Sequence, residues 1–137
     1  MNYIRLATIV LACAVLLSSH AYAKDVRAGR PAVNSRISAK AKEWFYRFQS
    51  GHIDRSQLDS AVNRELTDEM VKSEAARLRG LGRPVAFVYV GSGRVQKAIG
   101  YYFGVLFNGS ERIMEAIAFD PDGRIAGIDF QILAPSE

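Results

Sequence analysis

The chain has 137 residues, of which 49% are hydrophobic and 23% are charged, and its formal net charge is +4. This length provides the core of one domain but not of two. The basic residues are interspersed with acids and do not form the aromatic-flanked stripe of nucleic-acid-binding proteins, so we expect no nucleic-acid partner.

Residues 1–23 have the pattern of a cleaved signal peptide. Arg5 precedes an apolar run over residues 6–17, and small residues offer a cleavage site before Lys24. The run of about 12 residues is shorter than the roughly 20 that span a bilayer, which predicts export to the periplasm or the extracellular space without a stable membrane anchor. Two alternatives stay open, namely a lipoprotein signal acylated at Cys13 and an uncleaved anchor.

Cleavage removes Cys13, the one cysteine of the chain, so the exported protein has no disulfide and no thiolate metal ligand. It also leaves His52 as the one histidine, which is too few for a zinc site. Residues 24–36 are basic and contain no aromatic residue. We expect them to form a flexible lead-in to a single domain over residues 37–137.

Three helices are expected at the start of this domain. Apolar residues over 37–48 recur at helical spacing, and Gly51 provides a left-handed C-terminal cap. A short second helix is expected over residues 54–62, where an acidic residue opens a capping box. A third is expected over residues 68–79, because glycines and a proline follow it.

Four β-strands follow, because β-branched and aromatic residues replace the helical pattern. The strands are expected at residues 85–90, 96–107, 111–119 and 124–133. Their connectors at residues 91–94, Asn108-Gly109 and Asp120–Gly123 have hairpin-turn sequences, so sequential strands should pair antiparallel. N-terminal helices followed by a four-stranded antiparallel sheet indicate an α+β fold.

Turn geometry predicts the register of the sheet. A two-residue turn at Asn108-Gly109 places Tyr102 opposite Glu115, and a type I turn with a glycine bulge at Asp120–Gly123 places Glu115 opposite Asp129. These three residues then form one row. Glycines on the face of this row would let another surface approach closely, which favours a homodimer through the sheet. The opposite face is expected to cover the helices with Tyr101, Phe103, Val105, Met114, Ala116, Ile128, Phe130 and Ile132.

The segments WFYRFQSGHID, LTDEM, LRGLGRPVAFVYVG, YYFGVLFNG and FDPDGRIAGIDF together carry a family resemblance. They span residues 37–133 and are similar to the nuclear transport factor 2-like superfamily. The chain most resembles its small cystatin-like and SnoaL-like domains of unknown function in exported bacterial proteins. A closing D-x-D-G-K-I-A-G strand is common in those domains, and Arg124 replaces the lysine here.

The resemblance implies a strongly curved sheet wrapped around the helices as a cone, often dimeric through the sheet and sometimes with a pocket inside. Catalytic members use a carboxylate base with a tyrosine or a second acid. Asp129, Glu115 and Tyr102 are therefore the candidate catalytic residues, and the pKa of one opposed carboxylate should be raised. The competing interpretation is that this row faces solvent or a dimer partner, with Lys97 or Arg112 compensating its charge.

Aromatic residues also provide a candidate site for a small apolar ligand. Trp44 and Phe48 could roof a cavity walled by Tyr101 and Phe103, although such stripes are more often ordinary core. The Asp120–Gly123 turn departs from the spacing of a calcium loop, and no glycine-rich loop opens a helix for phosphate. We therefore expect no metal site and no cofactor.

Together these patterns favour an exported, non-catalytic binding or assembly module. Its expected partner is a second copy, a small apolar ligand or another exported protein. The alternative is a small cofactor-free isomerase- or hydrolase-like enzyme that uses a carboxylate and a tyrosine in the cone pocket. The fold hosts both classes, so it does not decide between them.

Overall fold

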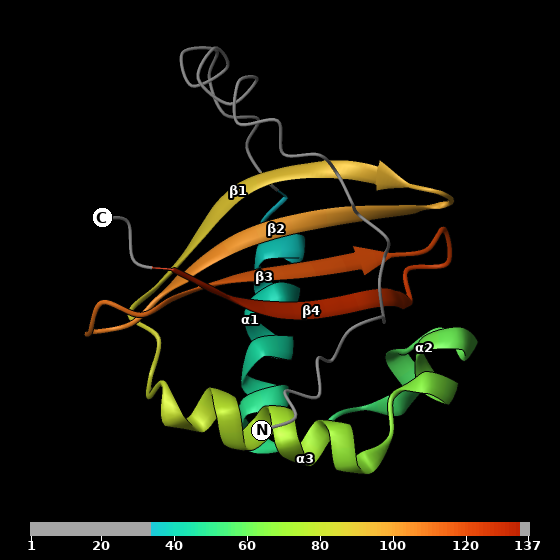
Figure 1. Ribbon diagram of the computed structural model, residues 1–137. Helices are drawn as coiled ribbons and strands as arrows, with labels where there is room; N and C mark the ends of the chain where they lie inside the picture. Colours follow the sequence, from blue (N-terminus) through green and yellow to red (C-terminus); the bar gives the residue numbers. More distant parts are fainter. Residues whose placement is uncertain (1–33, 135–137) are drawn as a thin grey trace, which may run out of the picture.

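The computed structural model of the chain describes residues 34–134 (Figure 1). The predicted signal peptide, nearly all of the predicted lead-in and the last three residues of the predicted domain lie outside the described residues. The first described helix, α1 (Ser35–Ser50), starts at Asn34, whose side chain accepts a backbone amide. It ends at Gly51, which has a left-handed φ of 78° and donates its amide to the Phe48 carbonyl at 3.0 Å. The predicted glycine cap is confirmed.

The predicted helix over residues 54–62 is instead two short elements. A 3₁₀ turn, η2 (Arg55–Gln57), is followed by an extended residue, Leu58, and then by α2 (Ser60–Glu65). The division has a local cause, because the Asp59 side chain accepts a backbone amide hydrogen bond at 2.8 Å and starts α2 anew.

The third helix, α3 (Asp68–Gly80), agrees with the prediction. Thr67 caps its start by accepting the amide of Met70 at 3.2 Å, and two acids in the first turn complement the helix dipole. Its buried side chains include Val71, Ala75 and Leu78.

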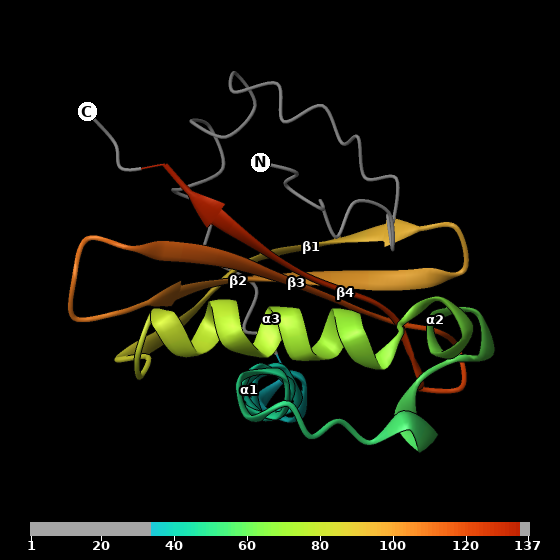
Figure 2. The ribbon, with the colours of Figure 1, turned by 60° about the horizontal axis from the view of Figure 1, so that its bottom comes forward.

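Four strands form one antiparallel sheet in the order β1-β2-β3-β4, so the predicted α+β class and meander are confirmed. The strands are β1 (Ala86–Val95), β2 (Ala98–Leu106), β3 (Arg112–Phe119) and β4 (Ile125–Leu133). Figure 2 shows that the helices all lie on one side of this sheet. We call the side that the helices cover the core face and the other side the open face.

Aromatic side chains of α1 form the centre of the core. Trp44 and Phe45 are fully buried, and Phe45 meets Phe130 of β4 edge-to-face at a centroid distance of 5.8 Å. Phe48 contacts the same ring at 5.3 Å. Each aromatic pair of this geometry stabilises the fold by about 1 kcal/mol, in addition to the free energy gained by burying the two rings. This cluster fixes α1 against the middle of the sheet.

The β1–β2 turn differs from the prediction. Residues 91–94 do not turn but continue β1 after a bulge at Val90, and the chain reverses at Gln96-Lys97. Neither Gly91 nor Gly93 has the positive φ of a tight hairpin turn, whereas Gln96 adopts a φ of 51°.

The β2–β3 turn is longer than predicted. Leu106 pairs with Arg112, which leaves five residues, 107–111, in the loop. A two-residue type I′ turn needs positive φ at both central positions, and neither Asn108 nor Gly109 has it. The β2–β3 register is consequently one residue away from the predicted one.

The β3–β4 turn confirms the predicted geometry at Asp120–Gly123. Gly123 has a φ of 80°, and Phe119 pairs with Ile125. The Asp120 carboxylate accepts the amides of Asp122 and Arg124, each at 2.9 Å, so this acid serves the turn itself.

A second irregularity follows that turn, because Ala118 pairs with Gly127 and Ala126 has no partner in the ladder. This extra residue is a β-bulge, which the sequence reasoning did not include. It shifts the rest of β4 by one position relative to β3.

Two backbone carbonyls of β4 have partners outside the sheet. The Asp59 amide donates to the Ile125 carbonyl at 2.9 Å. The Arg77 guanidinium donates to the Phe130 carbonyl and pairs with the buried Glu74 carboxylate. These bonds connect α2 and α3 to the last strand.

Candidate functional site

The predicted row of Tyr102, Glu115 and Asp129 does not form. Ala116 lies opposite both Tyr102 on β2 and Asp129 on β4. Glu115 lies opposite Phe103 and Phe130 instead, so its side chain is on the core face. The predicted register is therefore wrong at β3, because paired residues point to the same side of a sheet.

The two faces follow from this register. The β2 and β4 residues Tyr101, Phe103, Val105, Ile128 and Phe130 lie on the core face, as predicted. Strand β3 is turned over: Met114 and Ala116 lie on the open face, and the residues facing the helices are Ile113, Glu115 and Ile117. Ile132, which was also predicted to be core, is 53% exposed.

Glu115 is a buried acid without a partner. Its side chain is fully buried, and neither carboxylate oxygen has a hydrogen-bond partner. Burial raises the pKa of this carboxyl well above its ordinary value of 4.5, because charge is poorly solvated among apolar side chains. Its neighbours across the strands are Phe103 and Phe130, and such apolar surroundings favour the protonated, uncharged form of a carboxyl.

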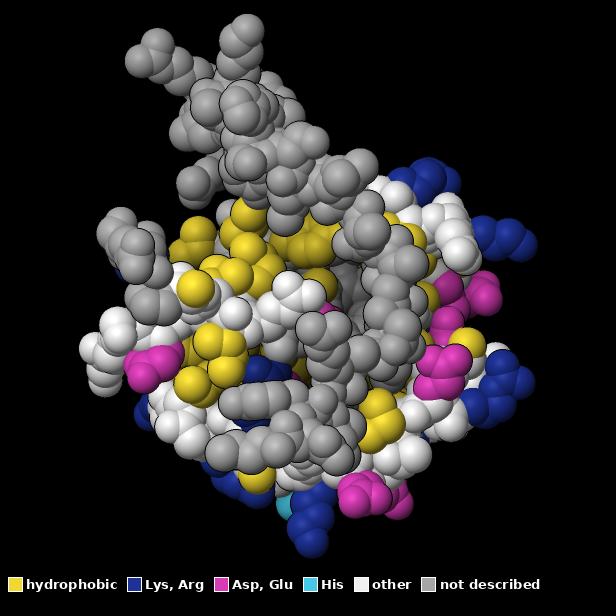
Figure 3. Space-filling view, in the orientation of Figure 1, with side chains coloured by type: hydrophobic (Ala, Val, Ile, Leu, Met, Phe, Trp, Pro, Cys, Tyr) yellow, Lys and Arg dark blue, Asp and Glu magenta, His cyan; other side chains and the backbone are white. Residues whose placement is uncertain are grey.

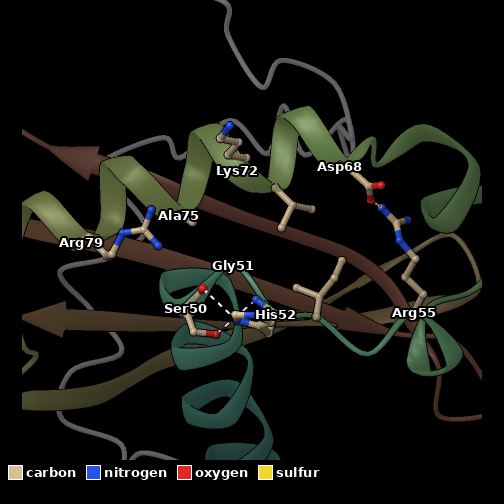
Figure 4. Close-up of a pocket in the computed structure, with 10 residues that line it drawn as sticks. Ser50, Gly51, His52, Arg55, Asp68, Lys72, Ala75 and Arg79 are labelled. Atoms are coloured by element: carbon tan, nitrogen blue, oxygen red, sulfur yellow. Dashed lines mark hydrogen bonds and ion pairs between the residues drawn. The ribbon is translucent and has the colours of Figure 1, made fainter.

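The candidate ligand-binding residues are packed together as core. Trp44, Phe48 and Phe103 are each no more than 2% exposed, and Tyr101 is half-buried against the core. The Trp44 indole nitrogen donates to the Gln57 side chain at 3.4 Å. None of these four residues lines the pocket of Figure 4 or the shallower pocket beside it.

Tyr102 and Asp129, the other two candidate catalytic residues, lie on the open face. The Tyr102 hydroxyl lies over Gly100, 3.6 Å from the place where a side chain at that glycine would begin. The Asp129 carboxylate accepts a hydrogen bond from the Gln131 side chain at 2.9 Å. Glu115 is on the other side of the sheet, so it cannot act on the same molecule as these two groups.

Small and apolar residues occupy much of the open face, which also carries Tyr102, Arg112 and Asp129. Figure 3 looks onto this face, and hydrophobic side chains gather there over β1 and β2. Val88 is 37% exposed and Leu133 is 38% exposed, although both are large and apolar. Glycine and alanine occupy the middle of β2, β3 and β4 at Gly100, Gly104, Ala116, Ala118 and Gly127.

A pocket of about 500 Å³ lies between the end of α1 and the side of α3 that carries Val71, Lys72, Ala75 and Arg79 (Figure 4). Sequence reasoning missed this pocket, which is also lined by His52. Its cationic residues, Arg55, Lys72 and Arg79, come from η2 and α3. The one sequence feature that points to this pocket is the seven-residue spacing of Lys72 and Arg79, which places both cations on the same face of one helix.

Residues 34–134 contain no cluster of three or more His, Cys, Asp or Glu side chains arranged to hold a metal ion. Among the helices that these residues form, none has the length and hydropathy needed to cross a membrane.

Comparison with known proteins gives no match: no family model, no curated protein and no solved structure matches the chain significantly.

Proposed function

We propose that the chain is an exported, non-catalytic assembly module that binds a second copy of itself through the open face of its sheet. The observation that carries the proposal is the composition of that face, which has small residues in its middle and exposed apolar side chains such as Val88 and Leu133. None of the helices within residues 34–134 lies over it. Apolar side chains gathered on a surface mark interaction sites, and small residues permit close approach.

The charges of the open face favour a second copy over an unrelated partner. Arg112 and Asp129 both lie on this face, and no acidic side chain of residues 34–134 pairs with Arg112. In a two-fold interface each contact occurs twice, so Arg112 of one copy can meet Asp129 of the other on both sides of the axis. Such opposed charges fix the register of an interface.

Charge reversal tests the interface. Light scattering of the exported chain at micromolar concentration should give a dimer mass, and Asp129→Arg or Arg112→Asp should weaken association at least about tenfold through like-charge repulsion. The double reversal Asp129→Arg with Arg112→Asp should restore the dimer. Arg64→Asp on the exposed side of α2 is the matched control and should leave the mass unchanged. A monomeric wild-type chain, or a double variant no better than the single ones, would contradict the proposal.

We propose the nuclear transport factor 2-like cone as the fold. Three features support it: the helices precede the strands, the strands form a meander, and the helix layer lies on one face of the sheet. An experimental structure in which the sheet curls around α1 is the expected result. A flat sheet would oppose the assignment.

Export is proposed from the sequence of residues 1–23. Sequencing the protein from a periplasmic or culture fraction should give Lys24 as the first residue. An uncleaved terminus in the membrane fraction would contradict this, and an acylated Cys13 would favour the lipoprotein alternative.

A second candidate function is a small cofactor-free enzyme that uses Glu115 as its acid or base. The observation that favours it is the buried carboxyl, which has no hydrogen-bond partner and whose pKa is raised by burial. This candidate requires a small molecule that reaches Glu115. Mass spectrometry should then detect a co-purified apolar molecule that is lost from Glu115→Gln. Its absence from the wild-type protein counts against the enzyme.

A further inference from the structure

The pocket between α1 and α3 has an apolar floor. Val71 is 5% exposed and Ala75 is 1% exposed, and Ile53 lines the same pocket. Gly51 brings the end of α1 close to α3, since a side-chain carbon at Gly51 would lie 3.5 Å from the Ala75 Cβ. Two small residues at this contact let the backbones approach and leave a hollow beside them.

The rim of the pocket is cationic. Arg55 closes one end by pairing with Asp68 at 2.6 Å and by donating to the Asn63 side chain at 3.0 Å, so its charge is already compensated (Figure 4). No acidic side chain within residues 34–134 pairs with Lys72 or Arg79. These two cations therefore give the pocket an excess of positive charge.

Arg79 is held in place at the pocket. Its guanidinium donates to the Gln49 carbonyl at 3.3 Å, and Figure 4 shows it reaching from α3 toward Ser50. The Gln49 side chain donates to the carbonyls of Leu78 and Gly82 at 3.0 and 2.7 Å, which fixes the end of α1 against the end of α3. One carbonyl contact leaves most of the five donors of the guanidinium for a ligand.

We propose that this pocket binds a small organic carboxylate whose apolar part lies on Val71 and Ala75. The planar guanidinium of Arg79 suits a carboxylate because two parallel hydrogen bonds form at once, and Lys72 adds a second positive charge. The volume of about 500 Å³ is in the usual range of ligand pockets. This site is separate from the open face and does not depend on the assembly function.

Hexanoate is a suitable probe, with hexanol and inorganic phosphate as its two partial analogues. Titration of the exported chain, followed by amide and methyl NMR signals, should give saturable hexanoate binding with a dissociation constant of about 1 mM, as expected for so small a ligand. The signals of Gly51, Val71 and Ala75 should move. Hexanol lacks the charge and phosphate lacks the apolar part, so each should bind at least about tenfold more weakly.

Variants separate a built site from general charge attraction. Arg79→Gln and Lys72→Gln should each weaken hexanoate binding about tenfold, whereas Arg64→Gln on α2 removes the same charge away from the pocket and should have no effect. All three residues are exposed, so the thermal midpoints should stay close to that of the wild type. Equal weakening by Arg64→Gln, phosphate binding as tight as hexanoate binding, or no saturable binding would overturn the proposal.

Discussion

The two faces of the sheet each carry one carboxylate near the middle of a strand, and the surroundings of the two groups are opposite. Glu115 of β3 lies under α1 with no hydrogen-bond partner, whereas Asp129 of β4 lies on the open face and accepts a hydrogen bond from Gln131. The difference shows that strand identity does not determine the environment of an acid. A shift of one residue in the ladder does, because alternate side chains face opposite sides.

The largest expected difference between the faces concerns packing. Ile117→Ala on the core face should lower the free energy of unfolding by about 3 kcal/mol, because it removes a fully buried side chain and leaves a cavity. Met114→Ala on the open face should cost about 1 kcal/mol or less in the monomer, since Met114 is only half-buried. Chemical denaturation at a concentration where the chain is monomeric measures both. If both substitutions lowered the free energy of unfolding equally, the assignment of Ile117 to the core face and Met114 to the open face would be wrong.

A smaller change in the free energy of unfolding, this time an increase, is expected when Glu115 is replaced by an apolar residue. Glu115→Met replaces a carboxyl that has no partner by an apolar side chain of similar length, and should raise the free energy of unfolding by about 2 kcal/mol at neutral pH. Glu115→Gln is the matched control, because it keeps a buried polar group without a partner and should not give this gain. A destabilising Glu115→Met substitution would indicate that the carboxyl is needed by the fold.

Glu115 also predicts how stability depends on pH. Burial raises the pKa of this group in the folded state, so the folded chain holds a proton that the unfolded chain releases above about pH 4.5. The contribution to stability is complete below the unfolded pKa and is lost as the pH rises toward and through the folded pKa. The slope between the two is up to about 1.4 kcal/mol per pH unit. Denaturation from about pH 5 to about pH 8 should show this loss in the wild type but not in Glu115→Met.

The smallest effect is expected on the open face. Asp129→Asn keeps an acceptor for Gln131 and changes a half-buried side chain, so the unfolding free energy of the monomer should change by less than about 0.5 kcal/mol. A decrease in the free energy of unfolding as large as that of Ile117→Ala would show that Asp129 lies in the core and not on the open face.

Most helices and strands could be predicted from the sequence, because the residues that start, cap or turn an element lie within a few positions of it. The glycine cap at Gly51 and the glycine bulge at Gly123 both concern backbone groups close to the residue that makes the turn. The second helix was predicted as one piece because Asp59, its second cap, was not recognised.

The register was harder to predict, because each error moves a whole strand to the other face. The five-residue β2–β3 loop shifts β3 by one position, and the bulge at Ala126 shifts β4 by one position in turn. The two shifts cancel between β2 and β4, so Tyr102 and Asp129 share a face as predicted while Glu115 does not. Whether a turn or bulge forms depends on packing across the sheet, which the turn sequence alone does not contain.

The pocket depends on contacts that no sequence window includes. Lys72 and Arg79 have the spacing of one helix face, but the opposite wall comes from Gly51 and His52, about twenty residues earlier in the chain. Cations at this spacing on α3 are also found on ordinary solvent-exposed helix surfaces, so the spacing alone does not indicate a pocket. The apposition of α1 and α3 is what makes these cations part of a concave site.

The hydrogen bonds at β4 have a consequence for how sheets could extend from one molecule to the next. β4 is the last strand of the sheet, and the exposed edge of a last strand is where another chain can add a strand and begin a fibre. Here the Ile125 carbonyl is taken by Asp59, and the Phe130 carbonyl is taken by Arg77. An incoming strand would have to displace both, so this end of the sheet is protected against open-ended growth.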